Sequence, residues 1–405
     1  MLSAFTSGIH SLPAAPFGIP FGAPTQNLIV DTVEKKPKAT NGEDLPRALS
    51  YLADYGGCGY YRCLAPNFLL NLYQKAITTD VSCMLMDPRI YKSVRAVKFQ
   101  RQATTHQKQF IRDLKEYKNN FGFKTIYEVD DVIISKYIPI YNRNKHHYDT
   151  KEIQTNILEI LSEMDEIIVT TEYFKNFLKN ETGLTNITSV PNYLMRWWFD
   201  RYYNLGDLVK NFEKNKKKPT IAIFASGTHV DVLNRNGGVD DFTPVLKQII
   251  STIKDFNWHF VGCYPLQLKP YIDRGDVKYT KWVDLPKFPE LMKEVSPQLT
   301  FASLLNNEFN NCKSNIKLIE AGAFGIPCVC PNSPAYSDAI LKYNTGSDFI
   351  DIIKTVLKNQ TTYAEQCKKA RALANNYWLD DAQNLMKHHE VYFTPFGSKD
   401  RNYLT

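Results

Sequence analysis

Short apolar runs alternate along the chain with stretches in which apolar residues recur every three or four positions. The first kind of run is typical of buried strands, and the second spacing is typical of helices with one face in the core. The predicted strands are residues 48–53, 81–86, 96–99, 124–129, 166–170, 188–191, 220–224, 258–263, 277–283, 299–304 and 327–330. The predicted helices between them include residues 107–119, 153–164, 172–180, 242–256, 285–295 and 313–324.

This alternation of strand and helix predicts parallel sheets joined by right-handed crossovers. A Lys-rich stretch at residues 210–218 interrupts the pattern, and we interpret it as a linker or a solvated edge. On either side lies a unit of the doubly wound α/β type, with about 170 residues in each. Ligands bind at the carboxyl ends of the strands in such sheets, so two facing units predict a site in the cleft between them.

The same pattern divides the chain into four predicted parts. They are an N-terminal arm at 1–46, a first α/β domain at 47–210, a second at 211–376, and a final helix at 377–405 that crosses back to the first domain. The arm is rich in Pro and Gly with scattered Phe, so it is either a flexible tail or a docking segment for a protein partner.

Composition narrows the class of protein. Hydrophobic residues make up 43% and charged residues 22%, which excludes a disordered, collagen-like or coiled-coil chain. No apolar run reaches the length of about 18 residues that a membrane-spanning helix needs. The N-terminus has no basic residue before its mild apolar run, and the eight Cys form no dense framework. We therefore expect no secretory signal and a cytoplasmic location.

The most informative segment of the second unit reads FNNCKSNIKLIEAGAFGIP. Asn310 or Asn311 is suited to cap a helix, whose first-turn amides would form an anion site together with Lys313. Lys317 and Glu320 lie three residues apart and therefore share a helix face. An anion site followed by a carboxylate farther along one helix matches a nucleotide, with the diphosphate at the helix start and the ribose hydroxyls at Glu320.

This segment resembles the donor-binding segment of GT-B glycosyltransferases, particularly of the glycosyltransferase 1 superfamily. The resemblance implies two Rossmann-like domains with an interdomain cleft, a nucleotide-sugar donor that we expect to be UDP-linked, and a Glu that holds the ribose. That family often has another Glu eight residues earlier, where this chain has Cys312, so the sugar is not predicted. The implied donor-binding residues of the segment are Asn310, Lys313, Ser314, Lys317 and Glu320.

Glycine-containing loops follow the first strand of each unit. In the second unit, Gly227 would let the backbone approach a diphosphate, and the hydroxyls of Ser226 and Thr228 would donate hydrogen bonds to it. In the first unit the loop reads GGCGYYR, and the resemblance implies that it lies near donor and acceptor, although a simple tight turn is the alternative. Its predicted site residues are Gly56, Gly57, Gly59 and Arg62.

Two adjacent carboxylates, Asp130 and Asp131, end the strand predicted at 124–129. A carboxylate at a strand end could orient or deprotonate an acceptor hydroxyl, whereas the alternative is that Asp131 only caps the next segment. Phage DNA glucosyltransferases of this fold use an acidic residue at a comparable strand end, and we match Asp130 to it. No acidic pair typical of a metal site lies near the donor segment, so we expect no metal.

Positive charge is concentrated in the first unit. Residues 89–124 carry ten Lys or Arg and two Asp or Glu, whereas the whole chain has a net charge of +7. A basic patch of this kind predicts a polyanionic partner, although a solvated helix face or an anionic lipid surface would also fit. The predicted DNA-contacting residues are Arg95, Lys98, Arg101, Lys108 and Arg112.

A later run, NGGVDDF, resembles a segment of glycosyltransferases encoded by T-even-type phages and their relatives. Together with the basic charge, it leads us to expect sugar transfer to 5-hydroxymethylcytosine in double-stranded phage DNA, in the host cytoplasm. One alternative is a glycosyltransferase that acts on surface polysaccharide, lipid or protein. The other is a non-catalytic DNA- or virion-associated protein with a GT-B-like fold, which the Cys at position 312 would fit.

Overall fold

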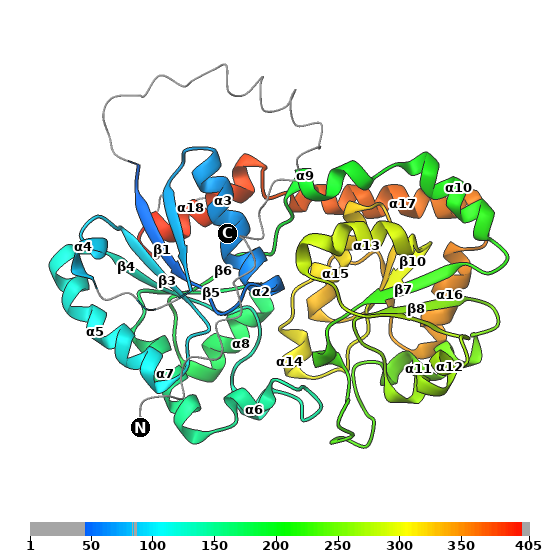
Figure 1. The fold of residues 1–405 in the computed structure, drawn as a ribbon, viewed down its shortest axis with the longest axis horizontal. Helices are drawn as coiled ribbons and strands as arrows, with labels where there is room; N and C mark the ends of the chain where they lie inside the picture. The colour runs from blue at the N-terminus through cyan, green and yellow to red at the C-terminus, as the bar shows by residue number, and fades with distance from the viewer. Residues whose placement is uncertain (1–44, 83, 85–86, 399–405) are drawn as a thin grey trace, which may run out of the picture. The chain divides into compact units, whose positions relative to one another are not determined.

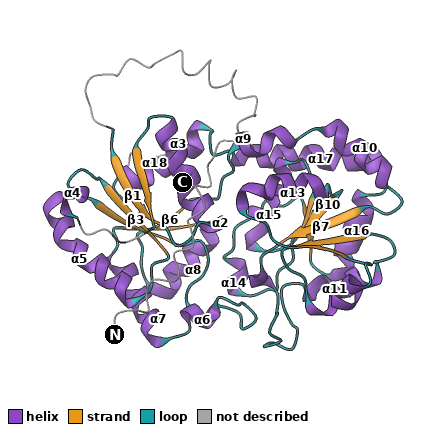
Figure 2. Ribbon diagram, in the orientation of Figure 1, coloured by secondary structure: helices purple, strands orange, loops and turns teal. Residues whose placement is uncertain are grey.

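The computed structural model describes residues 45–82, 84 and 87–398 (Figure 1). The predicted arm at 1–46 lies outside the described residues, apart from its last two positions. From Leu45 onward, two six-stranded sheets follow each other along the chain, and helices cover them (Figure 2).

All strand pairings in both sheets are parallel. The first sheet has the order β2-β1-β3-β4-β5-β6, with β1 Arg47–Tyr51, β2 Ile77–Val81, β3 Ala96–Gln100, β4 Lys124–Glu128, β5 Glu166–Val169 and β6 Ile187–Ser189. The second has the order β12-β11-β10-β7-β8-β9, with β7 Thr220–Phe224, β8 Asn257–Val261, β9 Lys278–Thr280, β10 Leu299–Phe301, β11 Cys328–Pro331 and β12 Leu341–Tyr343. The predicted α/β class with two successive parallel units is confirmed.

Helices connect the strands, as the apolar periodicity predicts. Those of the first half are α2 Gly57–Gly59, the π-helix η1 Tyr60–Leu64, α3 Ala65–Leu72, α4 Pro88–Tyr91, α5 Thr105–Phe121, α6 Lys145–Tyr148, α7 Lys151–Glu163, α8 Glu172–Thr182 and α9 Arg196–Phe199. Those of the second half are α10 Leu205–Asn215, α11 Thr243–Ser251, α12 Lys269–Asp273, α13 Phe288–Val295, α14 Glu308–Asn311, α15 Ile316–Ala323, α16 Gly346–Val356, α17 Gln360–Ala374 and α18 Ala382–Phe393.

Local sequence fixes the ends of these helices. Helix α5 begins after Thr104, which forms a capping box with Gln107, and it ends at Gly122, whose φ is 72°. A capping box satisfies backbone N–H groups of the first turn, and glycine adopts the left-handed conformation at a helix end without strain. The strand β3 is buried at all five positions, which is typical of a parallel sheet covered on both faces.

The Lys-rich stretch at 210–218 is not a linker, so that alternative is wrong, whereas its lysines are solvated as the other alternative expects. Most of it belongs to α10, where the ring of Phe212 is buried and stacks on Tyr363 of α17, with 4.6 Å between the ring centroids. Lys210 and Lys214 are exposed on the same helix. Phe212, with the partly buried Leu205 and Leu208, therefore packs one face of this helix on the core and leaves the lysines on the other. The short strand β12 and the helices α16 and α17 were also not predicted.

The last helix, α18, packs on α3, β3 and β4. The ammonium of Lys124 donates hydrogen bonds to the carbonyl oxygens of Val391 and Thr394 at 2.6 and 2.9 Å. The phenol of Tyr392 forms a 2.8 Å hydrogen bond with the Ser50 hydroxyl of β1. The C-terminal segment is thereby bound to elements of the first sheet, while the domain limits at 210 and 376 stay predictions.

Candidate active site

Polar side chains that follow strands of the first sheet contact side chains that follow strands of the second. The phenol of Tyr61 donates to Glu320 Oε1 at 2.6 Å, and the ammonium of Lys313 lies 3.4 Å from Asp131 Oδ1. Asn192 Nδ2 donates to the Ser314 hydroxyl at 2.9 Å. Residues 309–327, here called the donor segment, supply one partner of each pair. Lys313 and Asp131 are predicted site residues from the two units that meet, whereas Tyr61 and Asn192 were not predicted.

The donor segment does not form the single helix that we predicted. It contains the end of α14 and the whole of α15, with a break around Lys313, and Asn307 rather than Asn310 caps α14. Asn310 is 1% exposed and donates to Asp241 Oδ1 at 2.6 Å, so it supports the site from inside. The break places Lys313 before the first turn of α15, with its ammonium 4.6 Å from the ring centroid of Phe309.

A buried histidine lies beside the second lysine of this segment. His229 Nδ1 lies 2.7 Å from Asp241 Oδ2, and the ammonium of Lys317 donates to His229 Nε2 at 3.1 Å. These partners fix one tautomer, with the proton on Nδ1. Burial, and then the charge of Lys317, lower the pKa of His229 to about 4. His229 is therefore neutral at pH 7 and acts as a fixed acceptor for Lys317.

The carboxylate of Asp241 joins several polar groups of this cluster. Besides His229, it accepts a 2.6 Å hydrogen bond from the phenol of Tyr141. The pKa of Lys317 is lowered by burial and by the neighbouring charge of Lys313. His229, Asp241 and Tyr141 were not predicted as site residues. His229 directly follows the predicted Ser226–Thr228 loop, and this adjacency was the available signal.

Glu320 is 9% exposed, and burial raises its pKa to about 7. Its partner Tyr61 belongs to η1, which follows the glycine-rich loop. A Cβ at Gly59 would lie 1.8 Å from the Asp54 carbonyl oxygen, so only glycine fits there. The backbone N–H groups of Gly56 and Gly59 donate to Asp54 Oδ1 at 2.8 and 3.3 Å. The loop thus delivers Tyr61 to the predicted ribose carboxylate.

Arg62 of the same loop does not face the site. It is 2% exposed, and its Nε lies 2.6 Å from Glu128 Oε1 in a buried ion pair. It also donates to the Val190 carbonyl oxygen at 2.6 Å. Its role is to join strands of the first sheet. Gly57, at the start of α2, has no heavy atom within 4 Å of a Cβ built there.

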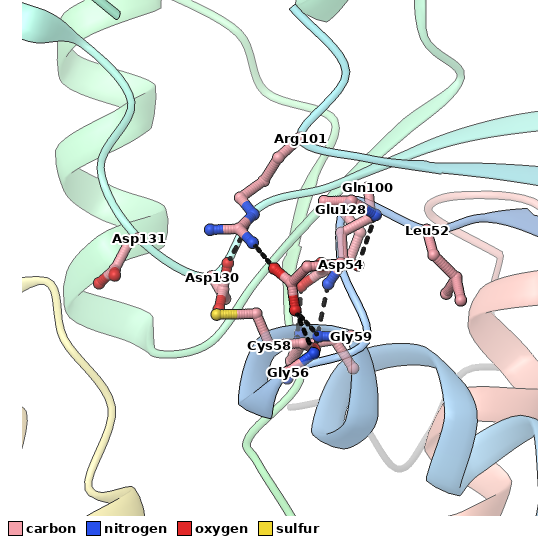
Figure 3. Close-up of polar contacts among 12 residues, drawn as sticks. Leu52, Asp54, Gly56, Cys58, Gly59, Gln100, Arg101, Glu128, Asp130 and Asp131 are labelled. Atoms are coloured by element: carbon pink, nitrogen blue, oxygen red, sulfur yellow. Dashed lines mark hydrogen bonds and ion pairs between the residues drawn. The ribbon is translucent and has the colours of Figure 1, made fainter. Parts of the chain in front are cut away.

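The two adjacent carboxylates point in different directions (Figure 3). Asp130 lies 3.4 Å from Arg101 Nε, and Arg101 also pairs with Asp54. The thiol of Cys58 lies in this cluster, and burial and then the charge of Asp130 raise its pKa. Asp131 points away from the cluster, its side chain is 37% exposed, and it approaches Lys313. Of the pair, Asp131 is the carboxylate that reaches the donor segment.

The Ser226–Thr228 loop lies against a third cation. The hydroxyls of Ser226 and Thr228 form a 2.8 Å hydrogen bond with each other. A Cβ at Gly227 would lie 3.3 Å from Arg143 Nη1, so the guanidinium covers the glycine backbone. Arg143 comes from the first half of the chain, and it was not among the predicted site residues. Two hydroxyls and a guanidinium are groups that bind phosphate oxygens.

The predicted DNA-contacting residues do not form one exposed surface. Lys98 is 2% exposed and donates to the Arg62 carbonyl oxygen at 3.0 Å, so the prediction that it contacts DNA is wrong. Arg101 lies in the Asp54–Asp130 cluster. Lys108 and Arg112 pair with Glu159 at 3.0 and 2.7 Å. Arg95 is the exposed member of the five.

Within residues 45–82, 84 and 87–398, His, Cys, Asp and Glu side chains form no group of three that could hold a metal ion. In the same residues, every helix is too short or too polar to cross a membrane.

No family model and no curated protein matches the chain. Among solved structures, HepE of Anabaena in complex with UDP and glucose aligns with a TM-score of 0.55 and 11% identity, over 86% of this chain and 99% of that chain. HepE in complex with UDP-glucose aligns over the same shares with a TM-score of 0.55 and 12% identity. TarM of S. aureus aligns over 75% of this chain with a TM-score of 0.49 and 11% identity, and the chain spans 56% of TarM's length. The likeness to HepE and the two parallel sheets confirm the predicted GT-B fold.

Proposed function

We propose that the chain is an enzyme that transfers a sugar from a UDP-linked donor to an acceptor hydroxyl. One observation carries the proposal, namely that Glu320 and Lys313 of the donor segment contact Tyr61 and Asp131 from the first half of the chain, with Lys317 held beside them by the neutral His229. The fold shared with HepE, whose structure contains UDP-glucose, supports the class of donor.

In this proposal Glu320 binds the ribose hydroxyls. Its carboxylate accepts a hydrogen bond from the Tyr61 phenol, and ribose hydroxyls would supply the same kind of donor. Lys313, Lys317 and the Ser226–Thr228 loop would bind the diphosphate through cations and hydroxyls. They would also stabilise the negative charge that develops on the diphosphate as it leaves.

The transfer breaks the bond between the anomeric carbon and a diphosphate oxygen, and forms a bond between that carbon and the acceptor oxygen. The proton of the acceptor hydroxyl passes to a base. We assign this base, or the orienting group, to Asp131, because its carboxylate is partly exposed beside Lys313. Asp130 is held by Arg101 and is the weaker candidate.

Hydroxymethylcytosine in duplex DNA is the acceptor that the phage resemblance favours. The ion pairs that α5 makes with α7 weigh against a DNA surface there, because they neutralise the charge that would bind phosphates. The proposed enzyme class does not depend on this choice of acceptor.

The test incubates the full chain with UDP-, GDP- and ADP-linked sugars and measures nucleoside diphosphate release, with and without candidate acceptors. We expect release from a UDP-sugar, and a large loss of it in Glu320→Gln. Release from none of the donors, with the folded state verified by circular dichroism, would overturn the proposal. Release from a GDP- or ADP-sugar alone would support the glycosyltransferase class, but it would show that the donor carries guanine or adenine and not uracil.

A further inference from the structure

A cavity of about 370 Å³ lies beside the candidate active site. Its walls come from Tyr137, from one face of α8, and from Glu308, the first residue of α14. Its volume falls within the range of about 300–1,000 Å³ that is typical of small-molecule sites. The established fold and the donor site proposed above leave this cavity without a role.

The cavity joins the reaction centre through α14. The phenol of Tyr173 donates to Glu308 Oε2 at 2.9 Å across the two halves of the chain. At the other end of this short helix, Cys312 is followed by Lys313, which lies 3.4 Å from Asp131. Tyr173 and Asp131 follow the carboxyl ends of β5 and β4, which are neighbouring parallel strands. The cavity and Asp131 therefore lie at the same edge of the first sheet.

Aromatic rings form one part of the cavity wall. The ring of Tyr137 packs edge-to-face against Phe177, with 4.9 Å between the centroids, and Tyr173 lies nearby on α8. The ammonium of Lys136 lies over one face of the Tyr137 ring, 4.8 Å from its centroid, which leaves the other rings of this wall for a ligand. The face of an aromatic ring carries partial negative charge and attracts the weakly positive C–H groups of a pyranose. A flat, ring-shaped molecule with apolar C–H faces therefore suits this wall.

Uncharged polar groups form another part of the cavity wall. Asn176 and Asn180 lie one turn apart on α8, so they share a helix face. Both are exposed, and neither side chain makes a hydrogen bond within the described part of the chain. Each amide offers two N–H donors and an acceptor, which matches the paired hydroxyls of a sugar.

The charge of the wall decides between acceptor classes. The charged lining residues are Glu181 and Glu308, and no lining residue is Lys, Arg or His. Lys136, outside the lining, pairs with Glu181 at 2.7 Å, and the Tyr137 phenol also donates to that carboxylate. Glu308 is therefore the lining carboxylate that has no cation partner within the described part of the chain. Carboxylates repel phosphate groups but accept hydrogen bonds from hydroxyls. The wall therefore disfavours a nucleic acid or an anionic lipid and favours a neutral polyol.

We propose that this cavity binds a neutral saccharide unit of the acceptor, held by the α8 amides and the aromatic wall beside Asp131. The inference rests on the proposed glycosyltransferase function and names its acceptor class. The acceptor is then a glycan, whose hydroxyl is glycosylated, rather than a modified base in DNA.

The test measures binding of acceptor probes to the full chain by saturation-transfer NMR and calorimetry, in the absence of donor. The probes are maltoheptaose, cellohexaose and chitohexaose, a 20-base-pair hydroxymethylcytosine duplex, and vesicles that contain phosphatidylglycerol. We expect one of the neutral oligosaccharides to bind, and the duplex and vesicles to bind more weakly. The variant Asn176→Ala/Asn180→Ala loses two side-chain partners, so its affinity should fall roughly 5- to 150-fold.

The control variant Asn119→Ala/Asn120→Ala removes two exposed amides from the end of α5 and should bind the oligosaccharide normally. UDP binding, measured separately, distinguishes the two proposals. If UDP binds but no oligosaccharide does, or if the α8 variant keeps wild-type affinity, the saccharide site is wrong and the donor site stands. Tighter binding of the duplex, lost in the α8 variant, would assign the cavity to DNA and overturn the inference.

Discussion

Two positively charged regions of the chain have opposite surroundings. In the basic run at residues 89–124, most cations of α5 face carboxylates that lie some 40 to 50 residues later in the sequence. The pairs are Lys108–Glu159, Arg112–Glu159, Arg112–Glu163, Lys115–Glu163 and Lys118–Asp165. In the donor segment, Lys317 instead lies beside the neutral His229 and near the second cation, Lys313, whose carboxylate partner Asp131 is 3.4 Å away and partly exposed.

The surroundings of a cation, more than its presence in the sequence, indicate whether it belongs to a ligand site. Cations that already have carboxylate partners hold two helices together and have little affinity left for an outside anion. Cations that are buried near each other raise the energy of the folded state, and an anionic ligand lowers it again. The basic run has the larger excess of positive charge. The two lysines of the donor segment, Lys313 and Lys317, have the environment of a binding site.

The largest expected effect concerns the carboxylate opposite the donor segment. Asp131→Asn should lower kcat by about 10²–10⁴-fold, because a positioned acid–base group contributes that much. Asp130→Asn is the matched control and should retain most activity, since its carboxylate pairs with Arg101. Steady-state kinetics, with the donor and acceptor that the incubation test identifies, measure the kcat of both variants. Loss of activity in Asp130→Asn alone would restore our original assignment of the base.

The second prediction separates Lys98 from the rest of the basic run. Lys98→Ala should lower the free energy of unfolding by about 3–5 kcal/mol, because it removes a buried charge whose partners stay buried. Arg95→Ala, at an exposed position, should change it by no more than about 0.5 kcal/mol. Urea denaturation of the two variants provides the measurement. A stable Lys98→Ala protein with weakened DNA binding would contradict the account.

The third prediction concerns the ribose carboxylate. Glu320→Ala should weaken UDP binding roughly 10- to 150-fold, the value of one charge-assisted hydrogen bond. Tyr61→Phe removes the phenol that donates to Glu320 and should change the affinity much less. Calorimetry with UDP compares the two variants. Equal affinities for wild type and Glu320→Ala would remove the ribose assignment.

The fourth prediction uses the pH dependence of stability. The pKa of His229 is about 4 in the folded protein, against an ordinary value near 6.5, so between these values the unfolded state binds more protons. The contribution of His229 is complete above pH 6.5 and is lost as the pH falls toward 4, by at most about 1.4 kcal/mol per pH unit. His229→Gln should lack this loss. Because the raised pKa of Glu320 acts in the opposite direction, the variant must be compared with wild type at each pH. If the free energy of unfolding changed with pH in the same way in wild type and His229→Gln, the buried, neutral state of His229 would be contradicted.

The alternation of strand and helix could be predicted from the sequence because most strands are compact apolar runs. The strand predicted at 81–86 lies instead at Ile77–Val81, where the sequence ITTDV is mostly polar. The strand β12 has three residues and little apolar character, so no pattern marks it. Helix α10 has an apolar stripe of Leu205, Leu208, Val209 and Phe212, and it was missed because the run of lysines at its end was given more weight. The break between α14 and α15 was missed because the residues around Lys313 are compatible with a helix, and side-chain contacts across the two sheets decide their conformation.

The donor segment could be identified because its residues are close in sequence and resemble a known motif. The partners of those residues could not, since Tyr61, His229 and Asp131 reach the segment from 88 to 259 positions away. The same reason explains the error over the basic run. A count of charge along the chain includes Lys98, which the sheet buries, and omits the carboxylates of α7.

The most direct test of the account is the affinity for UDP of two matched double variants, measured by calorimetry without acceptor. Lys313→Ala/Lys317→Ala removes the two cations of the donor segment, and Lys108→Ala/Arg112→Ala removes two cations of the basic run that pair with α7. The account predicts that the first variant loses at least about tenfold in affinity, because charged hydrogen bonds contribute about 1.5–3 kcal/mol each, and that the second binds UDP like wild type. Equal affinities for the two variants, or a larger loss in the second, would contradict it.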